Sequence, residues 1–232
     1  MRILSSVLLF FFVLLSFDTY AQISIGIKGG PDFSKFTNAV QGPDASGNIT
    51  TQSSGTKTQF YGQIFVDIPL DTTRWLNIRP GIEYIGAGGS MSPTGDYYVA
   101  NGFQPSTKYA LHYVDVPVEF VFSPKFDWGG PVVGFGLYFG DLLNGTIKPT
   151  GGSSSDVKIG NSAGDNFQRF DFGYCWTIGL QTNVGFLFGV DYQHGFLQVT
   201  PNTITNNQHS LNTHNSIWGL HLGWVFQLGH KK

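Results

Sequence analysis

The sequence predicts an all-β protein, an eight-stranded antiparallel up-and-down transmembrane β-barrel with four long outer loops and short periplasmic turns. Three observations predict this fold class. Eight segments alternate apolar residues with small or polar ones, and long and short connections alternate between them. Aromatic residues make up 16% of the chain and charged residues only 12%, a composition that argues against disorder. After the amino terminus no long apolar run follows that could form a membrane-spanning helix.

The amino terminus has the features of an export signal. Arg2 precedes an apolar run from Ile3 to Phe17, and Thr19, Tyr20 and Ala21 supply a small-residue cleavage site. The run is shorter than the roughly 20 residues that a spanning helix needs. We therefore expect residues 1–21 to be a signal peptide and residues 22–232 to form the outer membrane β-barrel domain.

The last predicted strand shows the alternation most clearly. Every second residue from Trp218 to Leu228 is large and apolar, whereas the other face carries glycine together with His221 and Gln227. A period of two with an apolar outer band and a mixed inner face is typical of a membrane barrel. We therefore expect the apolar face to contact lipid.

The other seven strands follow the same alternation, in chain order Gln22–Phe36, Phe60–Leu70, Trp75–Ile85, Tyr109–Phe122, Val132–Gly140, Arg169–Gln181 and Phe186–Phe196, before Ser216–Leu228. No charged residue interrupts the outward sets, as lipid contact requires, because an Arg or Lys at the bilayer midplane costs roughly 2–4 kcal/mol. The long connections, rich in Gly, Ser, Thr and Asn, are Thr37–Thr56, Gly86–Thr107, Asp141–Asn166 and Gln198–Asn215. The short ones are Asp71–Arg74, Ser123–Pro131 and Asn183–Gly185.

Charge within the strands is predicted to lie inside the barrel. The inward charged residues are Lys28, Asp67, Arg79, Glu83, Asp115, Glu119, Arg169, Asp171 and Asp191. If Leu76 faces Phe122 in a hairpin, then Arg79 lies opposite Glu119 as an ion pair, and Glu83 lies opposite Asp115. Those two facing acids need a base such as Arg169 or Lys28 nearby, or one shifted pKa. We interpret the set as a structural charge network in a bore that side chains fill, in preference to proton or ligand chemistry.

No pattern in the sequence predicts a catalytic residue, a cofactor or a metal site. Asp171-Phe-Gly173 matches the kinase magnesium tripeptide only by letters, since no nucleotide loop accompanies it. His194, His209 and His214 lie at or near the last outer loop without diagnostic ligand spacing. Cys175 is the single cysteine, so no intrachain disulfide forms, and the net charge of −2 gives no footprint for nucleic acid.

Four strings of residues carry a resemblance to a known family: Gly26-Ile-Lys-Gly-Gly-Pro-Asp-Phe-Ser-Lys-Phe36, Arg79-Pro-Gly-Ile-Glu-Tyr84, His112-Tyr-Val-Asp-Val-Pro117 and Asp171-Phe-Gly173. With them the chain resembles the PorT-like outer membrane β-barrel proteins of Bacteroidota, over essentially the whole mature chain. The resemblance implies a small eight-stranded barrel, and one class of the family takes part in protein secretion. Two departures are Asp115 in place of the usual Glu and the residues that continue past Phe226.

The sequence leaves several functions open. The leading hypothesis is an outer membrane barrel of a Gram-negative bacterium, with a structural or loop-mediated binding role and no catalysis. The expected partners are outer membrane lipid and, through the outer loops, secretion-system or surface proteins, with the chain acting as a monomer. The alternatives are an accessory barrel of protein secretion, a hydrolase using rim residues such as Asp96, Asp165, His209 and His214, and a soluble lipocalin-like carrier. The carrier predicts the opposite polarity, with charges outside and apolar residues within.

Overall fold

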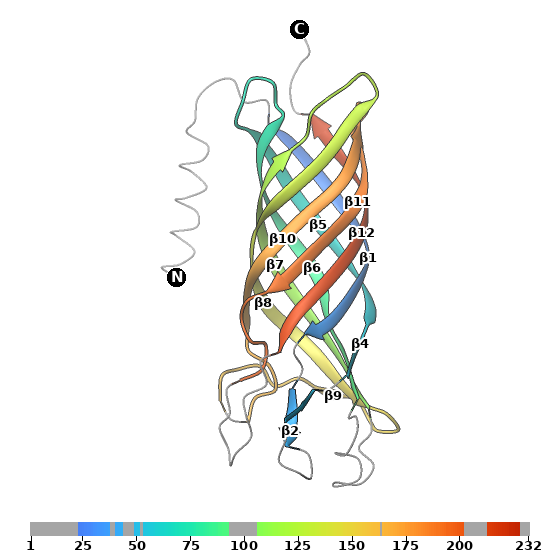
Figure 1. The fold of residues 1–232 in the computed structure, drawn as a ribbon, viewed down its shortest axis with the longest axis vertical. Helices are drawn as coiled ribbons and strands as arrows, with labels where there is room; N and C mark the ends of the chain where they lie inside the picture. The colour runs from blue at the N-terminus through green and yellow to red at the C-terminus, as the bar shows by residue number, and fades with distance from the viewer. Residues whose placement is uncertain are drawn as a thin grey trace.

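The computed structural model describes residues 23–37, 40–43, 49–51, 53–92, 106–162, 164–201 and 213–227. The predicted leader, residues 1–21, lies outside these ranges. Eight long strands form a closed antiparallel barrel (Figure 1). They are β1 (Ser24–Thr37), β5 (Lys57–Pro69), β6 (Leu76–Ser92), β7 (Thr107–Phe122), β8 (Gly129–Pro149), β10 (Phe170–Thr182), β11 (Phe186–Gly195) and β12 (His214–Gln227). The eight predicted strands are therefore confirmed.

Each of the eight strands pairs with the next one along the chain, and one further ladder, between β1 and β12, closes the barrel. Along the ladder between β1 and β12, Ser24 pairs with Gln227, while β8 pairs with β10 from Asp141 to Gly129. Closure leaves none of the eight strands with a free edge, so the backbone groups within the hydrocarbon are satisfied inside the sheet. The described residues contain no helix long and apolar enough to cross a membrane.

The two ends of the barrel differ. Short connections join β5 to β6, β7 to β8 and β10 to β11 at one end, which we call the turn end. Gly129 (φ 133°) and Gly185 (φ 99°) adopt left-handed backbone conformations there, which glycine tolerates best. The opposite end, at the bottom of Figure 1, is the loop end and carries the short strands β2 (Val40–Pro43), β3 (Ile49–Thr51), β4 (Ser53–Gly55) and β9 (Ser155–Asp156).

At the loop end the strands run farther than the sequence pattern predicts. Gly86–Ser92 and Asp141–Pro149 were expected to be loop, but they continue β6 and β8 as ladder. β4 pairs with β6, and β9 pairs with β8. The expectation is wrong because it ended each strand where apolar alternation stops. The ladder needs only backbone pairing, so it extends beyond the part of the wall that touches lipid.

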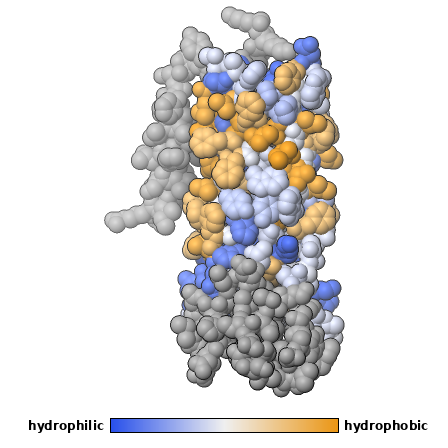
Figure 2. Space-filling view, viewed as in Figure 1, coloured by the Kyte–Doolittle hydropathy of each residue, from blue (hydrophilic) through white to orange (hydrophobic). Residues whose placement is uncertain are grey.

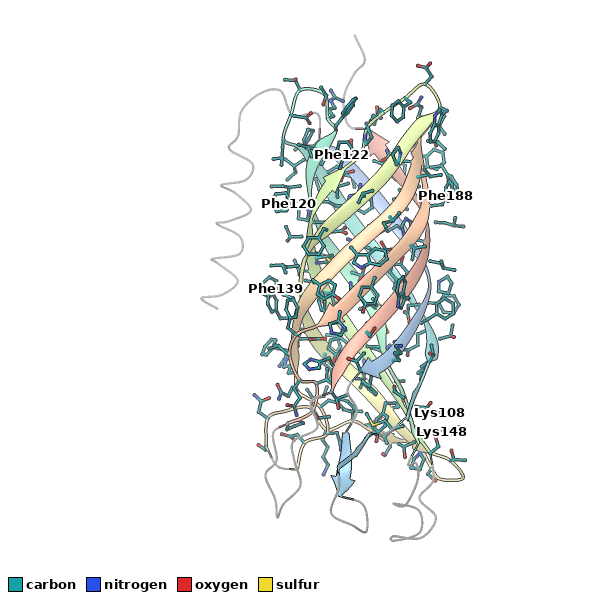
Figure 3. All side chains as sticks on the ribbon, viewed as in Figure 1. Lys108, Phe120, Phe122, Phe139, Lys148 and Phe188 are labelled. Atoms are coloured by element: carbon teal, nitrogen blue, oxygen red, sulfur yellow. The ribbon has the colours of Figure 1, made fainter. Side chains whose placement is uncertain are left out.

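The outside of the wall is apolar, as predicted. Phe60, Ile82 and Phe120 are each 64–73% exposed, and the visible face shows an apolar band that gives way to polar residues toward the loop end (Figure 2). Phe120, Phe122, Phe139 and Phe188 project outward from the wall (Figure 3). Within the part of the wall that carries this apolar band, charged residues such as Lys28, Arg79 and Glu119 are buried, which is opposite to the arrangement expected of a soluble carrier.

Candidate functional site

The middle of the bore is organised around Asp191 on β11. Lys28 of β1 donates from Nζ to Asp191 Oδ1 at 2.7 Å, and His221 of β12 lies with Nδ1 2.8 Å from Oδ2. The Tyr61 hydroxyl on β5 also donates to Oδ2. The Thr177 hydroxyl on β10 lies between Asp191 Oδ1 (2.6 Å) and Oε1 of Glu119 on β7 (2.8 Å). We call these residues the Asp191 layer: Lys28, Tyr61, Glu119, Thr177, Asp191 and His221.

Six of the eight strands therefore contribute to one hydrogen-bonded layer. Each member takes the inward position of its strand, and small inward neighbours make the room that the large side chains need. Gly189 pairs across the ladder with His221, and a Cβ at Gly189 would lie 3.0 Å from that imidazole. A Cβ at Gly219 would lie 2.8 Å from the ring of Tyr61. The glycines on the inner face thus serve packing of the bore.

Arg79 has a different partner from the one predicted. The predicted register is confirmed, since Leu76 pairs with Phe122 and Arg79 with Glu119. The Arg79 guanidinium nevertheless binds Asp67 of β5 through Nε (2.6 Å) and Nη2 (3.0 Å), and it lies 4.3 Å above the centre of the Phe65 ring. The predicted ion pair between Arg79 and Glu119 is wrong. Register fixes which Cα atoms face each other, but a long inward side chain can turn to either neighbouring strand.

The two facing acids, Glu83 and Asp115, do not have the basic partner that was expected beside them. Glu83 and Asp115 pair across β6 and β7 as predicted and are both buried. Lys28, one of the bases expected beside them, pairs instead with Asp191, and Glu83 accepts a hydrogen bond from Gln193 Nε2 at 2.5 Å. Asp115 Oδ1 is a buried oxygen without a hydrogen-bond partner among the described residues.

Asp171 lies in a separate polar group. Its Oδ2 accepts hydrogen bonds from the Tyr138 hydroxyl on β8 (3.1 Å) and from Asn215 Nδ2 on β12 (2.8 Å). Asn215 Nδ2 also approaches the Tyr113 hydroxyl at 3.4 Å. The neutral partners of the buried charges, among them Tyr61, Thr177 and Gln193, are the residues that sequence reasoning missed. Their inward strand positions were the available signal.

Arg169 does not belong to the interior. Its side chain is 61% exposed and binds Asp141 through Nε (2.7 Å) and Nη2 (3.0 Å). The prediction extended the alternation of β10 back to residue 169, but β10 begins at Phe170. Arg169 therefore lies at the rim and is not held to the inward side.

Apolar side chains close the loop end of the bore. The ring of Phe167, from the connection between β9 and β10, stacks on Phe36 with centroids 5.9 Å apart and meets Tyr109 edge-on at 5.5 Å. Val199, from the connection between β11 and β12, packs in the same cluster. We call this cluster the outer cap, and its buried members are Phe36, Tyr61, Ile85, Ala87, Leu111, Tyr113, Leu142, Phe167, Val199 and Ile217. A smaller apolar cluster near the turn end comprises Phe65, Val121, Val132, Leu187 and Val225.

The chemistry of the bore is that of a filled structural core. Polar layers alternate with apolar ones, and most polar groups in them bind one another. In the described part of the chain, no three His, Cys, Asp or Glu side chains are arranged to hold a metal ion. His194 and His214 lie together with ring centroids 6.1 Å apart. His209 and Asp96, which the hydrolase hypothesis needs, lie outside the described residues.

The sequence was compared with known protein families and with curated proteins. Residues 19–200 match the family described as outer membrane protein beta-barrel domain. No curated protein matches the chain.

Solved structures with a similar fold are distant in sequence. They include the attachment invasion locus protein Ail of Yersinia pestis (11% identity, 88% of this chain and 98% of that one, TM-score 0.38). Neisserial surface protein A shares 13% identity over 90% of this chain and 99% of its own, with a TM-score of 0.42. OprG of Pseudomonas aeruginosa shares 8% identity over 90% and 98%, with a TM-score of 0.44.

Proposed function

The chain belongs to the outer membrane protein β-barrel domain family, and from this premise we propose that it is a non-catalytic surface protein whose closed barrel anchors an ordered binding rim. The barrel lies in the outer membrane of a Gram-negative bacterium. Its lateral partner is membrane lipid, and its protein partners bind at the loop end. We also propose that it acts as a monomer, because barrel closure leaves no strand edge for a second copy to pair with.

The observation that carries this proposal is the filled bore. The Asp191 layer crosses the middle of the barrel, and Phe167 and Val199 cover the bore at the loop end. An eight-stranded barrel is only wide enough for side chains, and this one is packed with them. Such a barrel positions what lies at its ends and provides no diffusion path.

The described part of the rim is ordered by backbone hydrogen bonds. Val157 N donates to Gly145 O (2.9 Å), Gln168 N to Val199 O (2.8 Å) and Leu142 N to Arg169 O (2.7 Å). These bonds tie the connection between β9 and β10 to the strands and to the last connection. A binding surface that is ordered before contact loses less conformational entropy on association, which supports a recognition role.

Two measurements test the proposal. In planar lipid bilayers the wild-type barrel is expected to give no steady single-channel conductance, and a reproducible open channel would contradict a closed anchor. In intact cells, a photo-crosslinking residue at Lys158 of the rim is expected to capture surface partners, whereas the same residue at Leu70 of the turn end is not. Capture from Leu70 alone would place the partner in the periplasm and overturn the rim assignment.

A second candidate is an accessory barrel of protein secretion, and the PorT-like resemblance supports it. The four strings of the resemblance fall on β1, β6, β7 and β10, which are parts of the wall. They therefore bear on architecture more than on the rim. Deletion of the gene should reduce surface export of secreted proteins if this candidate holds, and unchanged export would remove it.

A further inference from the structure

Two lysines face each other on the outside of the barrel near the loop end. Lys108 of β7 pairs directly with Lys148 of β8 across the ladder, and both side chains are exposed (Figure 3). Like charges directly opposite one another in a sheet are destabilising. Within the described residues, neither lysine forms an ion pair with a carboxylate. The pair is therefore a local concentration of positive charge that a bound anion would stabilise.

The pair lies on the outward face of the wall, just beyond the part of that face that touches the hydrocarbon. Lys108 keeps the parity of the lipid-facing Val116, Val118 and Phe120 on the same strand. On the other side of Lys108, Ser90 of β6 continues the cross-strand row. A ligand in this row would approach laterally, along the barrel wall, and not through the bore.

The height of the pair suits a lipid headgroup. The Tyr84 hydroxyl and His112 Nδ1, 3.0 Å apart, mark where the apolar wall of β6 and β7 turns polar, and tyrosine favours the membrane interface. Lys108 lies four residues beyond His112, roughly 10 Å farther along the membrane normal for a strand rising about 3.4 Å per residue and tilted about 40°. Lysine stems bend toward the interface, which brings both ammonium groups into the headgroup layer.

Among the described residues, one carboxylate on this face lies near the pair in the sheet but does not neutralise it. Asp156 of β9 pairs with Thr146, two residues before Lys148, so it is a diagonal neighbour. Diagonal positions lie about 7–8 Å apart, and no ion pair joins Asp156 to Lys148 in the structure. A single carboxylate at this distance cannot balance two facing ammonium groups.

We propose that Lys108 and Lys148 form a lateral binding site for the phosphate of an anionic lipid headgroup in the outer leaflet. Two ammonium groups on adjacent strands can chelate one phosphate, and the Ser90 hydroxyl can donate to the same group. The proposal rests on the membrane location of the barrel and is independent of what the rim binds. A soluble anion would not need the lateral, interface-level placement that these residues have.

The amount of glycolipid that the purified protein retains measures binding at the proposed site. Wild-type protein is reconstituted with a bisphosphorylated glycolipid or with the same glycolipid lacking phosphate, and the retained lipid is counted by native mass spectrometry after transfer to detergent. The expected result is preferential retention of the phosphorylated form. A basic residue near an anionic membrane surface contributes enough that K108Q or K148Q should weaken retention roughly 5-fold, and the double variant about 30-fold.

Three controls make the outcome decisive. K35Q removes an exposed lysine of β1 outside this row and should retain the glycolipid as the wild type does, while K108R/K148R should restore retention. Folding of each variant is verified by heat-modifiable migration. The proposal is overturned if K108Q/K148Q retains as much phosphorylated glycolipid as K35Q, or if both glycolipid forms are retained equally. Displacement by millimolar inorganic phosphate as effective as that by the phosphorylated glycolipid itself would also overturn it, because the site would then be for free phosphate.

Discussion

The Asp191 layer and the outer cap fill the same bore and share Tyr61, but only the cap also takes side chains from the connections between strands. Every member of the Asp191 layer lies on a barrel strand, and its hydrogen bonds link β1, β5, β7, β10, β11 and β12. The outer cap takes Phe167 and Val199 from connections between strands. The difference implies that the layer stabilises the barrel as a whole, whereas the cap stabilises the docking of the rim onto a barrel that already exists.

The largest expected effect comes from removing the centre of the layer. Asp191→Leu leaves the buried Lys28 ammonium without its carboxylate, and breaking a buried pair in this way costs about 3–5 kcal/mol. Urea unfolding in phospholipid vesicles should show this loss in the free energy of unfolding of the whole barrel. The double variant Lys28→Met/Asp191→Leu should recover part of it, because no unpaired charge remains. A single variant as stable as the wild type would show that the layer does not stabilise the barrel.

A smaller loss is expected from crowding the wall beside the layer. The Cβ of Gly136→Ala would collide with the carbonyl oxygen of Val118, and overpacking of this kind costs about 1–3 kcal/mol. Gly62→Ala is the matched control, since nothing lies within 4 Å of a Cβ at that lipid-facing position. The same urea titration should separate the two variants. Equal stabilities would mean that the inner face is loosely packed.

Loss of a cap side chain should open the rim and leave the barrel closed. Phe167→Ala removes the ring stacked on Phe36, and we expect a local loss of about 1–2 kcal/mol, less than for a buried Phe on a barrel strand because the connection can rearrange. Lys158 O accepts hydrogen bonds from Asn166 N and Phe167 N, so undocking exposes this segment. Limited trypsin digestion should cleave after Lys158 about 5- to 30-fold faster. If cleavage is faster while the protein still migrates as the folded form on gels, then the cap stabilises the rim and not the barrel. Migration of the variant as the unfolded form would contradict this.

The smallest effect is expected at the rim ion pair. Arg169→Gln removes a bidentate contact with Asp141, but both side chains are substantially exposed, at 61% and 36%. Exposed pairs contribute up to about 1 kcal/mol. Urea unfolding should therefore change by less than that amount. A loss as large as that of Asp191→Leu would mean that the rim and the barrel unfold as one unit.

The sequence predicted the wall of this molecule better than its interior. Alternation located all eight strands, because lipid contact imposes one chemical rule on every outward residue. The pairing of Leu76 with Phe122 was also predicted correctly, since hairpin register follows from strand ends and parity. The extension of β6 to Ser92 was missed, because a strand that continues past the lipid-contacting part of the wall is held by backbone pairing and does not require alternating apolar side chains.

The interior could be predicted only as a set of inward residues. Parity gave most of the buried charges, but it cannot tell which neighbour a long side chain selects, so Arg79 was assigned to Glu119 instead of Asp67. Neutral members such as Thr177 carry no charge pattern to detect. The cap depends on contacts between residues far apart in the chain, and Phe167 lies in a segment that reads as loop.

Cys175 points into the bore and is only 4% exposed, and it is the single thiol of the chain. During export this sulfur is accessible to solvent, and barrel closure hides it behind the sheet. A membrane-permeant maleimide would therefore label the chain before assembly and spare it afterwards. The protein carries its own reporter of insertion, with which the time course of assembly can be followed without introducing a foreign residue.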